Sequence, residues 1–267
     1  MGPDMTEWQI FAVKYARHDR MAHENLLGGD PHDTSPMPID YFVWALVSAE
    51  TAIVVDTGYD EPMARKRGRE FLRPPDEGLR KVGVDPGAVR DVIITHMHYD
   101  HSGNHSMFPN ATFHVQDKEM AFATGRAMTH AITRFPFDED DVVQMVRRVY
   151  RNQVVFHDGD DTIAPGITIH HVGGHTKGMQ IVRVNTRRGW VVLASDASHY
   201  YANIENGFPY PVTYNIAEVL EGYRRVYELA SSRDHVIPGH DPLVFERYPA
   251  ASEATAGWIA RLDRNPE

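Results

Sequence analysis

The chain has 267 residues, which is enough for a large domain whose core needs no covalent cross-links. It has no cysteine, and this excludes disulfides, thiolate metal ligands and a cysteine nucleophile. The net charge of −10 argues against nucleic acid as a partner or substrate, because phosphate backbones would be repelled. Histidine is frequent, with 16 residues, and it is the commonest metal ligand and general base in proteins.

We expect one domain over residues 1–267, in which residues 1–37 form an N-terminal strand and a long loop. Short apolar runs rich in β-branched residues predict strands at 41–48, 52–55, 92–94, 112–115, 167–169, 181–184, 190–194 and 236–237. Apolar spacings of three and four predict helices over 139–150 and 216–229, and a weaker terminal helix over 250–262. This order favours an α+β fold, with two mixed sheets packed together and helices outside them.

Residues 1–16 contain no apolar run typical of a secretory signal, and no stretch approaches the length of a membrane span. We therefore expect a cytoplasmic protein that does not bind a membrane. Nothing in the sequence indicates the oligomeric state.

Five of the expected strands each lead to a residue that can contact a metal ion, namely Asp56, His96, His175, Asp196 and His240. The densest of these segments is His96-Met97-His98-Tyr99-Asp100-His101. Imidazole nitrogens and carboxylate oxygens suit zinc and similar ions. If the strand ends lie side by side, these ligands meet at one rim, where functional loop residues usually lie.

These segments resemble the metallo-β-lactamase superfamily, and within it the N-acyl homoserine lactonase branch. The resemblance covers about residues 38–241. It rests on Val55-Asp56-Thr57-Gly58, on the segment from His96 to His101, on Gly173-Gly174-His175-Thr176-Lys177-Gly178, on Ser195-Asp196-Ala197-Ser198 and on Gly239-His240-Asp241. It implies an αββα sandwich with a site for two divalent metal ions, with zinc expected, between its two sheets.

Residue by residue, the resemblance implies two groups of ligands joined by one carboxylate. His96, His98 and His175 would bind one ion, and Asp100, His101 and His240 the other. Asp196 would bridge the two ions, and Asp56 would orient a ligand histidine from outside the first shell. Histidines outside these motifs, such as His114, are expected to be structural.

The expected reaction is hydrolysis of a small molecule, in which a hydroxide bridging the two metals opens a lactone ring. Asp100 would carry a proton to the leaving group. The substrate could be an N-acyl homoserine lactone, which would make the enzyme quorum-quenching. Another lactone, carboxylic ester or thioester on the same scaffold is the alternative. A redox diiron protein is disfavoured because His98 stands where that branch usually has glutamate, and a non-catalytic module is disfavoured because no ligand is missing.

One position departs from the lactonase pattern. That branch has a tyrosine three residues after the bridging aspartate, as a hydrogen-bond donor to the substrate carbonyl. Here the position is His199, followed by Tyr200 and Tyr201. We expect either the histidine or one of these tyrosines to be the donor, unless His199 only packs near the site.

Two further segments are candidates for substrate contact. Residues 122–150 are rich in methionine, phenylalanine and arginine and could form one wall of an apolar pocket, or ordinary core. The loop 203–214 is similar, with Phe208, Tyr210 and Tyr214.

Overall fold

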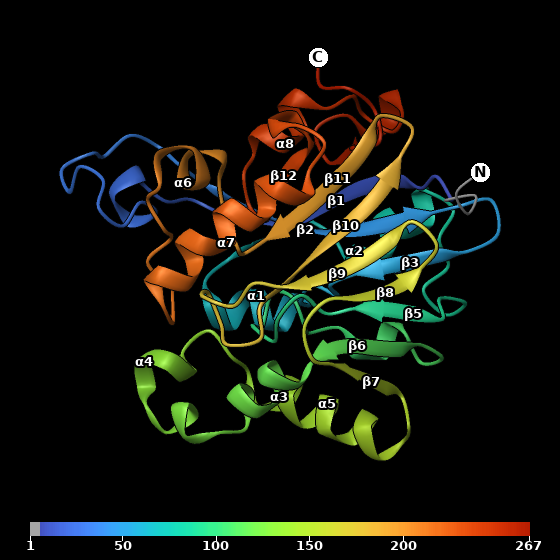
Figure 1. Ribbon diagram of the computed structural model, residues 1–267, viewed down its shortest axis with the longest axis horizontal. Helices are drawn as coiled ribbons and strands as arrows, with labels where there is room; N and C mark the ends of the chain where they lie inside the picture. The colour runs from blue at the N-terminus through green and yellow to red at the C-terminus, as the bar shows by residue number, and fades with distance from the viewer. Residues whose placement is uncertain (1–5) are drawn as a thin grey trace.

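Two facing β-sheets form the centre of the structure, a computed structural model that describes residues 6–267 (Figure 1). The first sheet has the order β13-β1-β2-β3-β5-β6-β7, with β4 paired to β1, and the second has the order β12-β11-β10-β9-β8. The strands are β1 (Gln9–His18), β2 (Ile39–Val47), β3 (Ala52–Val55), β4 (Glu70–Phe71), β5 (Asp91–Ile93), β6 (Thr112–Gln116), β7 (Val154–His157), β8 (Asp161–Ala164), β9 (Ile167–His171), β10 (Gln180–Thr186), β11 (Gly189–Ser195), β12 (Val236–Pro238) and β13 (Ile259–Arg261).

The helices connect these strands. They are α1 (Glu61–Arg67), α2 (Pro75–Lys81), α3 (Asp117–Ala123), α4 (Ala131–Arg134), α5 (Glu139–Tyr150), α6 (Tyr201–Asn206), α7 (Ile216–Leu229) and α8 (Leu243–Arg247). Short 3-10 helices lie at Ala22–Glu24, His105–Met107, Arg126–Thr129, Arg233–His235 and Glu253–Thr255. Among residues 6–267, none of the helices has the length and apolar character required to span a membrane.

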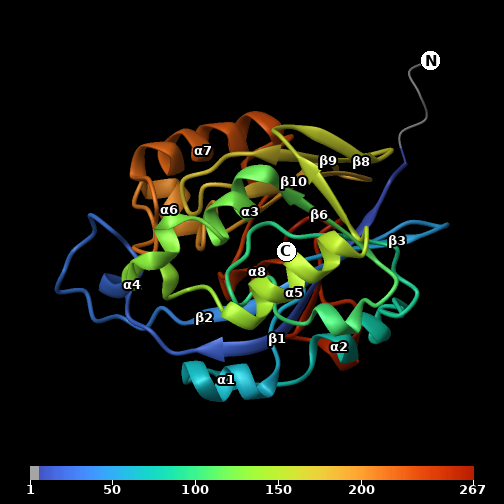
Figure 2. The same ribbon diagram turned by 90° about the horizontal axis from the view of Figure 1, so that it is seen from below.

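Three apolar layers hold the elements together. The central layer lies between the sheets, where Trp44 and Ile93 of the first sheet belong to the same buried cluster as Ile169 and Leu193 of the second. A second layer contains residues of α2, α3 and α5 packed with residues of the first sheet. A third packs α7 on the outer face of the second sheet. Figure 2 shows this order, with α7 on one side and α1 and α2 on the other. The expected αββα sandwich of two mixed sheets is therefore confirmed.

The local predictions hold where a pattern is long or strongly apolar. The helices predicted over 139–150 and 216–229 are α5 and α7, and strands cover all eight predicted runs. The terminal helix predicted over 250–262 is wrong. Gly257 has a φ of +77°, which a helix cannot continue through, and Ile259 pairs with Val13 at the edge of the first sheet. In the N-terminal segment 1–37, β1 is the expected strand and is followed by a long loop, whereas residues 1–5 lie outside the described residues.

One buried carboxyl group should make stability depend on pH. Asp141 on α5 is 5% exposed, and its Oδ2 has no hydrogen-bond partner among residues 6–267. Burial, with the charges of Asp138, Asp60 and Asp140, raises its pKa from 3.8 to about 8. The pKa of Asp141 is higher in the folded than in the unfolded state. The group therefore does not lower the free energy of unfolding below pH 3.8, and lowers it increasingly as pH rises towards 8.

We therefore expect Asp141→Asn to stabilise the protein by about 3 kcal/mol at pH 8, roughly half of the full linkage value because the group lines a surface pocket of about 330 Å³. The gain should shrink to near zero by about pH 4. Urea unfolding of both proteins at a series of pH values measures it. A gain that does not change with pH would show that Asp141 is ionised without cost.

Candidate metal centre

The rim formed by the ends of five strands carries the histidines and aspartates selected from the sequence. Strands β3 and β5 are parallel neighbours, so Asp56 and the segment that begins at His96 leave the first sheet at the same edge. His175, Asp196 and His240 follow β9, β11 and β12 of the facing sheet. The structure thus brings together all seven predicted ligands, which are buried except for the partly exposed Asp100.

The first group of ligands surrounds one carboxylate oxygen. His175 Nε2 lies 3.0 Å from His98 Nδ1 and 3.1 Å from Asp196 Oδ2. His96 Nε2 is 3.7 Å from the same Asp196 oxygen. Four ligand atoms, one from each residue, all lie within 4.8 Å of one another.

The second group surrounds the other oxygen of the same carboxylate. His101 Nε2 lies 3.2 Å and His240 Nε2 3.0 Å from Asp196 Oδ1. The same two nitrogens are 3.6 and 3.7 Å from Asp100 Oδ2. Asp196 therefore presents one oxygen to each group, which is the arrangement that a bridging ligand requires.

The donor atoms fit two divalent metal ions. His96 Nε2, His101 Nε2 and Asp196 Oδ1 are buried without hydrogen-bond partners, an arrangement that is costly unless something else binds them. Burial lowers the pKa of His96 and His98 well below the usual value, so both rings are neutral, as metal binding requires. A set of histidine nitrogens and aspartate oxygens suits zinc.

Asp196 is held as an anion despite its burial. Burial alone would raise its pKa, but the surrounding His199, His240 and His101 hold the pKa well below its usual range. The backbone also confines this carboxylate closely. Ser195 has a φ of +46°, and a Cβ on Gly239 would lie 2.8 Å from Asp196 Oδ1. Glycine is therefore required at position 239, beside the ligand.

Buried acceptors fix the ring orientations of two ligands from outside. Asp56 accepts hydrogen bonds from Thr95 N and Thr95 Oγ1, both at 2.8 Å, and from His101 Nδ1 at 2.7 Å. The backbone oxygen of Asp40 accepts from His240 Nδ1 at 2.9 Å. In both histidines the hydrogen bond at Nδ1 turns Nε2 towards the centre, where it would bind a metal ion.

Glu119 on α3 lies outside the motifs. Its carboxylate joins two of the loops that carry predicted ligands. Its carboxylate is fully buried and accepts from Met97 N at 2.8 Å, from Thr176 Oγ1 at 2.6 Å and from Gly178 N at 3.0 Å. It therefore holds the His96–His101 segment against the loop of His175. Glu119 is far from every motif in the sequence. Only the packing of α3 against the two loops reveals its role.

Three residues were candidates for the hydrogen-bond donor to the substrate carbonyl, and they lie in different surroundings. His199 is at the centre, and its Nε2 donates to Asp196 Oδ2 at 3.0 Å. The Tyr200 phenol donates to Met37 O at 3.3 Å, in the N-terminal loop. Tyr201 packs in the core between the sheets, with the Arg247 guanidinium 4.0 Å from its ring centroid. Neither tyrosine lines the cavity over the metal centre, whereas Tyr210 does; it lies after α6, which occupies the first four residues of the predicted loop 203–214.

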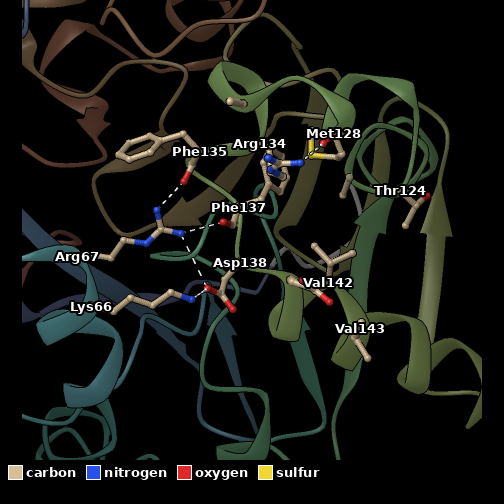
Figure 3. Close-up of a pocket in the computed structure, with 13 residues that line it drawn as sticks. Lys66, Arg67, Thr124, Met128, Arg134, Phe135, Phe137, Asp138, Val142 and Val143 are labelled. Atoms are coloured by element: carbon tan, nitrogen blue, oxygen red, sulfur yellow. Dashed lines mark hydrogen bonds and ion pairs between the residues drawn. The ribbon is translucent and has the colours of Figure 1, made fainter.

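Two hollows near the metal centre share one lining residue, Phe135. A cavity of about 80 Å³ lies directly over the ligands, and its other walls are Arg20, Ile39, Tyr41, Arg69, Tyr99, Phe135, Pro136, Tyr210 and Val212. A pocket of about 710 Å³ lies beside it, between α1, α3, α4 and α5 (Figure 3). Phe135 lines both, and the ring of Phe137, which lines the pocket, is 4.7 Å from that of His98.

Relatives of this chain include lactonases and a probable metallo-hydrolase. An N-acyl homoserine lactonase of Bacillus sp is 26% identical over 221 residues, which are 76% of this chain and 82% of the relative. The N-acyl homoserine lactonase AiiA of Bacillus thuringiensis subsp. kurstaki is 26% identical, over 74% of this chain and 81% of its own. A probable metallo-hydrolase of Mycobacterium tuberculosis is 23% identical, over 73% and 72% of the two chains.

Solved structures share the fold. A quorum-quenching N-acyl homoserine lactone lactonase superimposes with a TM-score of 0.74 at 22% identity, covering 89% of this chain and 94% of the other. A probable metal-dependent hydrolase from Staphylococcus aureus gives 0.75 at 15% identity, covering 99% and 96%. Residues 38–247 match the Metallo-beta-lactamase superfamily. With this match and the paired ligand groups, the chain belongs to the metallo-β-lactamase superfamily and is a metal-dependent hydrolase whose site fits two divalent ions.

Proposed function

We propose that this enzyme opens the ring of N-acylated lactones, with N-acyl homoserine lactones as the substrate class. The observation that carries the proposal is the apolar pocket that opens beside the cavity over the ligands, at Phe135. Support also comes from the relatives, several of which are named as lactonases for this class. Such enzymes are quorum-quenching because their substrates are bacterial signals.

The seven ligands account for the chemistry of ring opening. Two divalent ions bound by them would supply a water nucleophile of lowered pKa and would polarise the ester carbonyl. Asp100 lines the cavity and is partly exposed to it, so its carboxylate can take a proton and pass it to the leaving alkoxide. Asp56 and the backbone of Asp40 keep two ligand rings in the orientation that this chemistry needs.

The acyl group would occupy the pocket of Figure 3. Its wall is mainly apolar, with Ala123, Met128, Ala131, Phe135, Phe137, Val142 and Val143. Three cationic groups at its edge are bonded within the protein, since Arg67 donates to Phe135 O and Phe137 O, Lys66 to Asp138 and Arg134 to Met128 O. An alkyl chain that leaves the metal cavity past Phe135 thus meets apolar surface without displacing an ion pair.

Substrate preference should therefore rise with acyl length. We expect kcat/KM to increase by up to about fourfold for each added methylene that the pocket buries, which corresponds to about 0.8 kcal/mol per methylene. Val143→Trp should fill the pocket and lower kcat/KM about tenfold for a ten-carbon acyl homoserine lactone, with little change for a four-carbon one. Initial rates across an acyl series measure both effects.

Ile132→Trp is the matched control, since Ile132 is 86% exposed and does not line the pocket. The panel should include an unsubstituted γ-lactone, a linear ester and a thioester. A flat dependence on chain length would remove the acyl pocket from the proposal. Hydrolysis of the linear esters or thioesters alone would exclude lactones as substrates.

A further inference from the structure

The ring of Tyr210 lies flat on the ring of His199. Their centroids are 3.7 Å apart and their planes differ by 12°, which is a stacked pair. Both residues line the cavity over the metal centre, and both are more than nine-tenths buried. The Arg20 guanidinium lies 5.6 Å from the Tyr210 centroid. The position of the Tyr210 ring is thus set by neighbours on the cavity wall.

Several other polar groups at this cavity have polar partners within the protein. His199 Nε2 donates to Asp196. The phenols of Tyr41 and Tyr99 are 3.3 Å apart, and Tyr99 also accepts from Arg69 Nε at 3.3 Å.

Tyr210 differs from these groups, because its phenol has no hydrogen-bond partner among residues 6–267. Burial, together with the carboxylates of Asp196 and Asp100, raises the pKa of Tyr210, so the phenol keeps its proton. Tyr210 is therefore a protonated donor on the cavity wall.

We propose that Tyr210 donates a hydrogen bond to the carbonyl oxygen of the ester that is hydrolysed, and that His199 serves as the platform on which its ring rests. This inference rests on the proposed ester hydrolysis. Negative charge grows on that oxygen as the carbonyl is attacked, so a fixed donor there stabilises the transition state more than the bound substrate. His199, whose Nε2 lies 3.0 Å from Asp196 Oδ2, would act on the substrate through the tyrosine.

Tyr210→Phe tests this directly, because it keeps the stacked ring and removes only the hydroxyl. One such donor is typically worth about a hundredfold or more in kcat; with the carbonyl also polarised by metal we expect a loss of roughly tenfold. KM should change little, since the bond strengthens only as the reaction proceeds. The zinc content of the purified protein should be that of the wild type.

Two further variants separate the donor from its platform. His199→Phe can still stack on Tyr210 but cannot donate, so it should keep more activity than His199→Ala, which removes the platform. Tyr227→Phe is the matched control, because it removes a phenol that accepts from Arg233 and does not line the cavity. It should leave kcat, KM and zinc content unchanged.

The proposal is overturned if Tyr210→Phe keeps the wild-type kcat, or if it loses zinc. It is also overturned if Tyr200→Phe or Tyr201→Phe is the damaging change, or if His199→Phe is inactive while Tyr210→Phe is not. A wild-type protein that hydrolyses linear esters but no lactone would exclude only the lactonase, and the same variants would then be assayed on the ester. A protein inactive on every carboxylic ester and thioester would overturn both proposals.

Discussion

Asp196→Ala is expected to remove both metal ions and to abolish hydrolysis. The two oxygens of this carboxylate face the two separate groups of ligands, so one substitution affects both sites. It also leaves the buried histidines without their central negative charge. Loss of a group outside the first shell typically costs about 10- to 100-fold in metal affinity, so loss of this carboxylate should cost more than about 100-fold.

Elemental analysis of protein purified without chelator measures the effect. We expect about two equivalents of zinc in the wild type and much less than one in Asp196→Ala, in keeping with two metal sites. His114→Ala is the control, since His114 pairs with Asp91 and His157 away from the centre. Circular dichroism would show that both variants fold. A fully active wild type with one equivalent of metal would contradict the two-ion centre, and equal damage from both variants would contradict the ligand assignment.

Glu119→Ala is expected to weaken one ion more than the other. The carboxylate connects the backbone after His96 to the loop of His175, and it makes no contact with the group of Asp100, His101 and His240. Removing it leaves buried donors at Met97, Thr176 and Gly178 without an acceptor. This should lower the free energy of unfolding by about 3 kcal/mol or more.

Competition with a chromophoric zinc chelator, together with urea unfolding, distinguishes the two effects. We expect the affinity for one of the two equivalents to fall by about 10- to 100-fold, while the other changes little. Glu119→Gln is the conservative variant, because it keeps the volume and one acceptor oxygen. It should lose less affinity than Glu119→Ala. Equal weakening of both ions would show that Glu119 acts on global stability alone.

The sequence alone was sufficient for the features that depend on short stretches of chain. Helices α5 and α7 were predictable because their apolar residues recur every three or four positions, and the strands because their β-branched runs are short and bounded by polar residues. The segment from His96 to His101 carries so many ligands that its chemistry is visible without a structure. Strand runs that lead to Asp196 and His240 also indicate a shared rim before any contact is known.

Tertiary structure decided what depends on contacts between distant residues. The segment 259–261 is a strand because the edge of β1 offers Ile259 a hydrogen-bonded partner, which no local pattern reveals. Glu119 acquires its three donors only when α3 packs beside two loops. Of the tyrosines near Asp196 in the sequence, Tyr200 and Tyr201 point into packed interior, while Tyr210 reaches the cavity by way of a loop. Side-chain direction at the end of a strand depends on the turn and on the neighbouring sheet, so proximity in sequence could not show that Tyr210 lines the cavity.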